Sequence, residues 1–374
     1  MFFKNEIRKI LRFPLFWIII AACTGFNIFL LSAQMYYERV GVKAINAYVT
    51  SGEAPSYDKY NLCADYDQAK ATAYDTYYQD FDIWAFKADW EEMFVEKNSA
   101  AAQKIIDRNY EIVAARLDEI KSDGEAYDHY YPGTTFSLHK FLYDDIFSVA
   151  LFELAVTAVF MTAYLMKYEE FHSTHYSVYT SKSGRAIIFS KALAAAAASA
   201  LAAVIVMTVT VVYFLILIPQ SVDFLKSSVS AAMATEARGM TIYPFLTWHK
   251  MSQRVYLLRA SLTVIGYTVL ASVITFVVSF FSKNAYVNAV LTAMLYFSFL
   301  IAYETIPGNN LLGFVLVFNP TVGMFSVSEW FMEYVLNPFI SYPYYETWVC
   351  IGWLLLSALL TLPLWQYFKV KNME

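Results

Sequence analysis

Residues 186–218 read AIIFSKALAAAAASALAAVIVMTVTVVYFLILI, and Lys191 is the one charged side chain among them. A helix needs about 20 apolar residues to cross roughly 30 Å of hydrocarbon. This run is therefore long enough to span a membrane, and five further runs along the chain satisfy the same requirement. The sequence predicts six spans, at residues 13–34, 146–166, 186–218, 255–281, 286–303 and 347–368.

The composition indicates a protein that has lipid as its solvent. Hydrophobic residues make up 58% of the 374 residues and charged residues only 16%, whereas a soluble domain is about one-half apolar. The net charge of −5 argues against a nucleic-acid partner, because phosphate binding needs a basic surface. Three cysteines are too few for a disulfide framework. The predicted fold class is an all-α integral membrane protein with six transmembrane helices.

The distribution of Lys and Arg predicts the orientation in the membrane, since these residues prefer short cytoplasmic loops. They are concentrated before residue 13, in the 167–185 loop and in the 369–374 tail, while 304–346 contains neither. Both termini are therefore expected in the cytoplasm of a multi-pass cell-membrane protein. This orientation leaves 35–145, 219–254 and 304–346 on the outer side.

The insert at 35–145 is acidic and rich in tyrosine, and is expected to form a mainly helical extracytoplasmic domain. Two sets of residues recur at helical spacing, which usually indicates core packing and less often a ligand-binding face. Asp123-Gly124 is a typical helix end. The two sets are Tyr74, Tyr77, Phe81, Trp84 and Ala88, and Ile106, Tyr110, Val113, Leu117 and Ile120.

The outer segment 304–346 is apolar, but prolines divide it into pieces that are too short to cross the membrane. It is predicted to be re-entrant or interfacial, with its backbone polar groups buried against protein. A seventh span is the alternative. The dividing dipeptides include Pro307-Gly308, Asn319-Pro320 and Asn337-Pro338.

Residues 1–12 combine apolar and cationic side chains in the pattern of an amphipathic helix that lies along the membrane interface. The alternative is a positively charged flank that only fixes topology. The residues assigned to this membrane-interface helix are Phe2, Phe3, Lys4, Ile7, Arg8 and Lys9, with Ile10, Leu11 and Arg12 completing the pattern.

Glu153 is the one carboxylate well inside a span, where a charge costs about 3 kcal/mol or more. It is a candidate for the translocation pathway or a dimer interface, and the alternative is a glutamate hydrogen-bonded between helices. Lys191 and Arg259 are expected to extend toward the interfaces. No catalytic constellation is present, and no metal site is predicted because His172 and His175 lack further ligands.

The loop at 167–185 reads KYEEFHSTHYSVYTSKSGR and is followed by Ser190-Lys191. Its acidic start, its small residue with Thr, and its basic residue before Ser-Lys resemble the coupling loop of ABC-2 type transporter permeases. The N-terminal helix, the six spans and the Asn319-Pro320 segment extend the resemblance over the chain apart from the insert. The insert resembles the enlarged first outer loop of some bacterial members.

The resemblance implies a membrane-spanning permease subunit of an ATP-binding cassette exporter, in a bacterial cytoplasmic membrane, that moves an amphipathic peptide, antimicrobial or lipid. It also implies a cytoplasmic ATPase subunit and a homodimer or heterodimer with a second permease. The chain lacks G-x-x-x-x-G-K-[ST], so the partner ATPase would bind ATP and Mg, and this chain would hold no cofactor. The coupling residues implied are Glu169, Glu170, Thr174, Gly184 and Arg185.

A different class of function stays open beside the exporter. A membrane-anchored sensor or immunity protein would use the extracytoplasmic domain to bind an extracellular ligand, without transport and without an ATPase. An enzyme is not predicted, because no span carries a Ser-His pair, paired aspartates or H-E-x-x-H.

Overall fold

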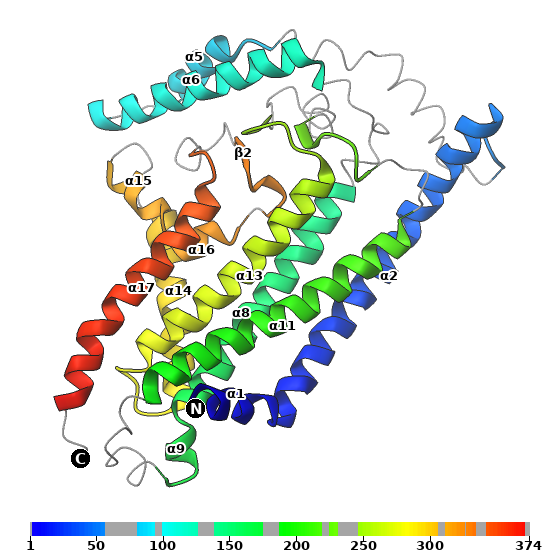
Figure 1. Ribbon diagram of the computed structural model, residues 1–374. Helices are drawn as coiled ribbons and strands as arrows, with labels where there is room; N and C mark the ends of the chain where they lie inside the picture. Colours follow the sequence, from blue (N-terminus) through cyan, green and yellow to red (C-terminus); the bar gives the residue numbers. More distant parts are fainter. Residues whose placement is uncertain are drawn as a thin grey trace.

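The computed structural model describes residues 2–56, 81–93, 99–125, 138–174, 187–218, 224–230, 246–305, 311–325, 327–333 and 342–370. Long helices dominate these residues (Figure 1). The longer helices are α1 (Phe2–Leu11), α2 (Pro14–Ser51), α5 (Ile83–Met93), α6 (Ala100–Asp123), α8 (Ser148–Met166), α11 (Ile187–Leu217), α13 (Gln253–Val278), α14 (Ala285–Thr305) and α17 (Tyr345–Val370).

Within the described ranges, six helical segments are long and apolar enough to cross a membrane, in agreement with the six spans predicted from the sequence. The second includes the π-helical turn η2 (Phe141–Phe147), which leads into α8. The first span is the apolar part of α2, and this helix continues to Ser51, where Gly52 with a φ of 74° ends it. The six segments are Pro14–Ala33, Leu138–Met166, Ile187–Leu217, Gln253–Val278, Ala285–Thr305 and Tyr345–Gln366.

The spans form one bundle in which α8, α11 and α13 pack against one another, with α2 beside α11, α14 beside α8 and α17 beside α13 (Figure 1). The alanine-rich part of α11 faces its neighbours, and small side chains let helix backbones approach closely in lipid. Its fully buried members are Ala194, Ala195, Ala198, Ala202 and Ala203.

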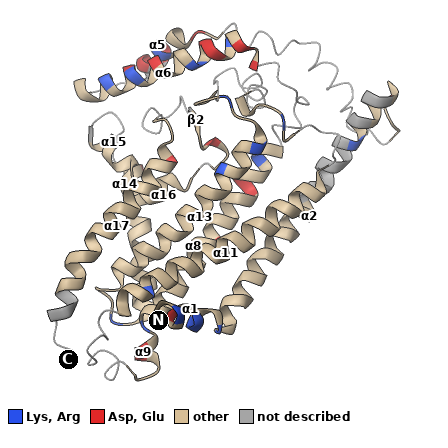
Figure 2. Cartoon of the chain, viewed as in Figure 1, with Lys and Arg blue, Asp and Glu red and all other residues tan. Residues whose placement is uncertain are grey.

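The outer surface of the bundle is apolar between two charged ends. Lys, Arg, Asp and Glu gather at the α1 end and at the α6 end and are sparse between them (Figure 2). Phe29, Ile216 and Leu359 expose 64%, 70% and 65% of their areas from three different spans. Large apolar surfaces of this kind indicate that the bundle is surrounded by lipid.

Helices α5 and α6 lie across the end of the bundle opposite α1 (Figure 1). Ser99 caps α6 by accepting a hydrogen bond from the Ala102 amide, and Gly124 follows its last turn. The predicted α6 stripe is confirmed, since its five members are buried together with Leu246 and Trp248. These members are Ile106, Tyr110, Val113, Leu117 and Ile120.

The other predicted stripe is wrong at two of its three described members. Trp84 is 50% exposed and Ala88 is exposed, whereas Phe81 is half-buried and Ile83 is buried among the described side chains of α5. The carboxylate of Asp82 accepts hydrogen bonds from the Trp84 and Ala85 amides, as a residue that caps a helix does, so α5 begins at Ile83. Tyr74 and Tyr77 lie outside the described residues.

Between α14 and α17 the described chain contains only short elements. They are α15 (Leu311–Val317), α16 (Pro320–Gly323), the 3-10 turn η4 (Val327–Glu329) and the strand β2 (Met332–Glu333). Strand β2 pairs antiparallel with β1 (Leu246–Thr247). This two-stranded pair is a small departure from the predicted all-α fold, and it holds the α15–α17 connection beside α6.

Candidate functional site

Four charged residues form a buried charge cluster at the α1 end of the bundle: Glu6, Lys9, Glu169 and Lys191. The Lys9 ammonium lies 2.7 Å from Glu6 Oε1 and 2.8 Å from Glu169 Oε1. Glu169 Oε2 forms an ion pair with the Lys191 ammonium. Glu6 and Glu169 are 3% exposed and Lys191 is 0% exposed, while Lys9 is half-buried, so three of the four charges are neutralised away from solvent.

The cluster joins three elements that are far apart in the sequence. Glu6 and Lys9 are one turn apart on α1, Glu169 lies on the single-turn helix α9 (Tyr168–Phe171), and Lys191 lies near the start of α11. Figure 1 shows α1 crossing the base of the bundle close to α9, and α1 packs against α11. The chain changes direction between α1 and α2 at Phe13, which is extended, and Pro14 begins the next helix.

The prediction that Lys191 extends to an interface is wrong. Its ammonium group is enclosed, and besides Glu169 it donates to the Met166 carbonyl at 3.4 Å. A lysine that is fully withdrawn from water needs a carboxylate partner. Glu169 fills this role because α9 turns back over the start of α11.

Glu169 and Lys9 have pKa values that favour their charged forms. Burial alone would raise the pKa of Glu169, but the ammonium groups of Lys191 and Lys9 outweigh it, and the pKa is lowered. Burial alone would lower the pKa of Lys9, but hydrogen bonds to Glu169 and Glu6 raise it. The contact between Lys9 and Glu169 therefore stabilises both groups in their charged forms.

The coupling residues implied by the resemblance occupy different environments. Glu169 is buried in the cluster, whereas Glu170 is 38% exposed and pairs with Lys167 at 3.2 Å. Thr174 is exposed, and its backbone amide donates to the Glu169 carbonyl at 2.8 Å. Gly184 and Arg185 lie outside the described residues. Phe171, which the sequence did not single out, exposes 62% of its area on α9.

The residues assigned to the N-terminal interfacial helix lie on α1. Phe2 and Phe3 expose 43% and 37% of their areas, Lys4 and Arg8 are exposed, and Ile7 is half-buried. Lys9 differs from them, because it turns inward to the buried charge cluster. One side of α1 thus faces the protein and the other faces outward.

Glu153 lies between α8 and α2. The Asn27 amide donates to Glu153 Oε2 at 3.4 Å, and Cys23, one turn earlier on α2, also faces the carboxylate. Asn27 is 0% exposed. This arrangement matches a glutamate hydrogen-bonded between helices, which was one of the two sequence interpretations.

The hydrogen bond from Asn27 to Glu153 should contribute to the stability of the folded protein. Glu153→Gln keeps an oxygen that accepts from Asn27, so its thermal unfolding should stay close to that of the wild type. Glu153→Leu leaves the buried amide without this acceptor, at a cost of about 1–3 kcal/mol. Thermal unfolding of both variants in the same detergent tests this. Equal unfolding temperatures for the two variants would show that the contact contributes no stability.

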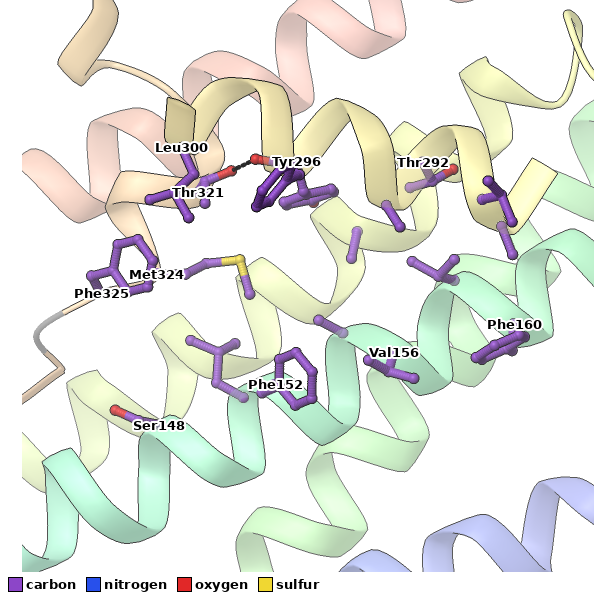
Figure 3. A pocket seen from close by; sticks show the side chains of 18 of the residues that line it. Ser148, Phe152, Val156, Phe160, Thr292, Tyr296, Leu300, Thr321, Met324 and Phe325 are labelled. Carbon is purple, nitrogen blue, oxygen red and sulfur yellow. Dashed lines mark hydrogen bonds between the residues drawn. The ribbon is translucent and has the colours of Figure 1, made fainter. Parts of the chain in front are cut away.

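An open apolar groove of about 600 Å³ lies on the other side of α8, between α8 and α14, with α16 and the residues after it at one end (Figure 3). Phe152, Phe297 and Phe325 are 69%, 62% and 50% exposed, so the groove opens on the outer surface of the bundle. Val156, Phe160 and Met324 belong to its apolar wall, and the side chains with hydroxyl groups that line it are Ser148, Tyr286, Thr292, Tyr296 and Thr321. Glu153 is absent from this lining.

A second buried polar group lies at the α6 end, around His139. Its Nδ1 is 2.9 Å from Gln253 Oε1 and its Nε2 is 2.8 Å from the Ser328 carbonyl oxygen. The rings of Tyr143 and Tyr256 pack against it at 4.5 and 4.8 Å. Both ring nitrogens are engaged by protein groups, which indicates a structural histidine that joins three segments.

No family model, curated protein or solved structure matches this chain. The buried charge cluster, the exposed α9 surface and the apolar groove therefore carry the functional argument by themselves.

Proposed function

We propose that this chain is the membrane-spanning permease subunit of an exporter of the ABC-2 class, driven by a separate ATPase. The observation that carries the proposal is the contact of Glu169 with both Lys9 and Lys191. Through these ion pairs, a short helix in the connection between two spans is attached to α1 and α11. A force applied to α9 would move all three elements together.

The exposed part of α9 supplies a surface on which an ATPase can act. Phe171 is 62% exposed, and Glu170 and Thr174 lie beside it in the sequence. Large aromatic side chains are common anchors of protein interfaces. The proposed orientation places this surface, and both termini, in the cytoplasm, where the ATPase would bind ATP and Mg.

The apolar groove suits the hydrophobic part of an amphipathic substrate. Its walls are formed almost wholly by apolar side chains, and it opens on the surface of the bundle that lipid surrounds (Figure 3). Hydrophobic pockets with a few polar groups are typical ligand sites. The proposed substrate is a peptide or lipid that enters from the membrane, and a second permease would complete the pathway.

The proposal predicts that an ATPase accompanies the full chain when it is purified from its native membrane in mild detergent. Phe171→Ala should reduce the retained ATP hydrolysis about tenfold, because loss of a central aromatic anchor typically costs 1–2 kcal/mol or more. Hydrolysis is measured after reconstitution into vesicles, per mole of permease.

The matched control is Phe281→Ala, which truncates a phenylalanine that is 67% exposed just after α13. It should retain the wild-type level of hydrolysis. A wild-type preparation without any associated ATPase would contradict the exporter and would favour the sensor or immunity protein. That second function gains support from α5 and α6, whose hydrophobic cluster packs with Trp248 beyond the end of the spans.

A further inference from the structure

A basic cavity of about 310 Å³ lies where α1 meets the end of α8 and the start of α9. It is distinct from the apolar groove. The polar and aromatic groups that line it are Asn5, Arg8, Lys9, Arg12, Tyr164 and Tyr168, and Phe13 stacks on Tyr164 with ring centroids 4.4 Å apart.

The cavity carries positive charge that the described part of the protein does not neutralise. Lys9 is balanced by Glu6 and Glu169. Arg8 and Arg12 are exposed and form no ion pair with the described residues; Arg8 lies on α1, and Arg12 directly follows this helix, one turn later, with its amide donating to the Arg8 carbonyl at 3.0 Å. No carboxylate of the described residues lines the cavity. Two guanidinium groups on the same side of a helix match the geometry of a phosphate, which arginine binds through paired hydrogen bonds.

The position of the cavity favours a lipid as the source of this phosphate. α1 lies across the end of the spans (Figure 1), and α2 enters the membrane from Pro14 onward. Leu15, Trp17 and Ile18 expose 45%, 45% and 61% of their areas on the first turns of α2. Trp17 also donates its indole N–H to the Leu11 carbonyl at 2.8 Å, and tryptophan is typical of the membrane interface. Acyl chains below a headgroup in the cavity would contact these side chains.

We propose that the basic cavity binds the phosphate of an anionic phospholipid through Arg8 and Arg12, with Asn5 and the tyrosine hydroxyls as further hydrogen-bonding groups. A zwitterionic headgroup carries an ammonium group that the two arginines would repel. Lys9 belongs both to the cavity and to the buried charge cluster, so the bound lipid lies directly beside the contact between α1 and α9.

The experiment compares the full chain in nanodiscs of phosphatidylcholine alone and of phosphatidylcholine with phosphatidylglycerol. Lipids retained on the protein are counted by native mass spectrometry after exchange into detergent. The wild type should retain phosphatidylglycerol in preference to phosphatidylcholine. Arg8→Gln with Arg12→Gln should weaken this retention about tenfold, which corresponds to the loss of charged hydrogen bonds worth about 1.4 kcal/mol. Arg8→Lys with Arg12→Lys keeps the charge and should give an intermediate result.

The matched control, Lys4→Gln with Lys283→Gln, removes the same charge from exposed positions outside the cavity and should retain phosphatidylglycerol as the wild type does. Equal losses in the control and in the arginine variant would overturn the site in favour of general surface attraction. Displacement of phosphatidylglycerol by inorganic phosphate at equal concentration would overturn the lipid as the occupant. Neither result depends on an ATPase, so the site and the exporter are tested separately.

Discussion

Glu169→Gln is expected to lower the free energy of unfolding by about 3–5 kcal/mol, because it leaves a buried ammonium group without its anion. Lys191 is 0% exposed and reaches only Glu169 and the Met166 carbonyl among the described residues. Lys9 would lose one of its two carboxylate partners as well. Thermal unfolding in detergent measures the loss, and Glu170→Gln is the control because Glu170 is 38% exposed.

The double variant Glu169→Gln with Lys191→Met separates stability from coupling. Replacing a buried ion pair by residues of similar volume is often neutral for stability, so most of the loss should be recovered. The link between α9 and α11 would remain absent, and ATP hydrolysis should no longer respond to the permease. A double variant as unstable as Glu169→Gln alone would contradict the assignment of the instability to unpaired Lys191.

The stability of the wild-type protein should depend on pH through Glu169 and Lys9, and the two variants, which lack Glu169, should lose the part due to this residue. Because the pKa of Glu169 is lowered in the folded protein, its stabilising effect is present above the unfolded value of about 4.3 and is lost as the pH falls through the lower folded value. Because the pKa of Lys9 is raised, its effect is present below about 10.4 and is lost as the pH rises through the higher folded value. The acid loss assigned to Glu169 should be absent in the double variant.

The six spans were predictable because a single contribution to the free energy, the transfer of apolar side chains into hydrocarbon, dominates their formation. Burying about 20 apolar residues in hydrocarbon outweighs every local preference, and an averaged hydropathy measures it directly. The α6 stripe was predictable for a related reason, since its apolar members alternate with charged residues that face solvent, such as Arg108, Glu111 and Asp118. In both cases the sequence itself contains the contrast between apolar and charged residues that decides which side chains are buried.

The charge cluster was not predictable because its contacts are set by packing between distant segments. Lys9 and Glu169 are 160 positions apart, and no periodicity shows that α1 folds back across α11. Lys191 resembles any lysine near the end of a span, where extension to the interface is the ordinary outcome. Only the position of α9 in the structure shows that the Glu169 carboxylate contacts the Lys191 ammonium group and keeps it inside the bundle.

The apolar groove was not predictable because the helix that forms one wall shows no contrast between apolar and polar sides. Phe152, Val156 and Phe160 recur every four residues, but α8 is apolar on all sides, so this spacing does not stand out. The groove exists because α14 carries small residues, Ala289 and Ala293, opposite this row. The depth of the groove depends on how α8 and α14 pack together, and the sequence of neither helix predicts it alone.

The second large effect is expected at the end of this groove, where Gly323→Ala should destabilise the fold. A methyl group at Gly323 would lie 2.1 Å from Tyr267 Oη, 3.0 Å from its Cζ and 3.2 Å from Val349 Cγ1. Tyr267 is 0% exposed, and its hydroxyl donates to the Glu346 carbonyl at 2.8 Å. Overpacking of this kind costs about 1–3 kcal/mol, and displacement of the tyrosine would add about 1 kcal/mol for its hydrogen bond.

Thermal unfolding of Gly323→Ala, alone and combined with Tyr267→Phe, tests this account. Removing the hydroxyl removes the shortest contact, so the second substitution should cost less in the Gly323→Ala background than in the wild type. Gly352→Ala is the control, since a methyl group there would meet nothing within 4 Å. Additive effects of the two substitutions would contradict a direct clash.

Gly323 also connects this packing to the groove. Thr321, Met324 and Phe325 line the end of the groove on either side of it, and the Trp330 indole N–H donates to the Gly323 carbonyl at 3.2 Å. The close approach of Gly323 to Tyr267 therefore fixes how far these three side chains stand from α8.

If Gly323→Ala pushes α16 outward, a hydrophobic fluorescent probe that binds the groove should change its affinity, while the same probe should bind Gly352→Ala as it binds the wild type. Unchanged binding in a destabilised Gly323→Ala protein would mean that α16 supports the bundle without shaping the groove.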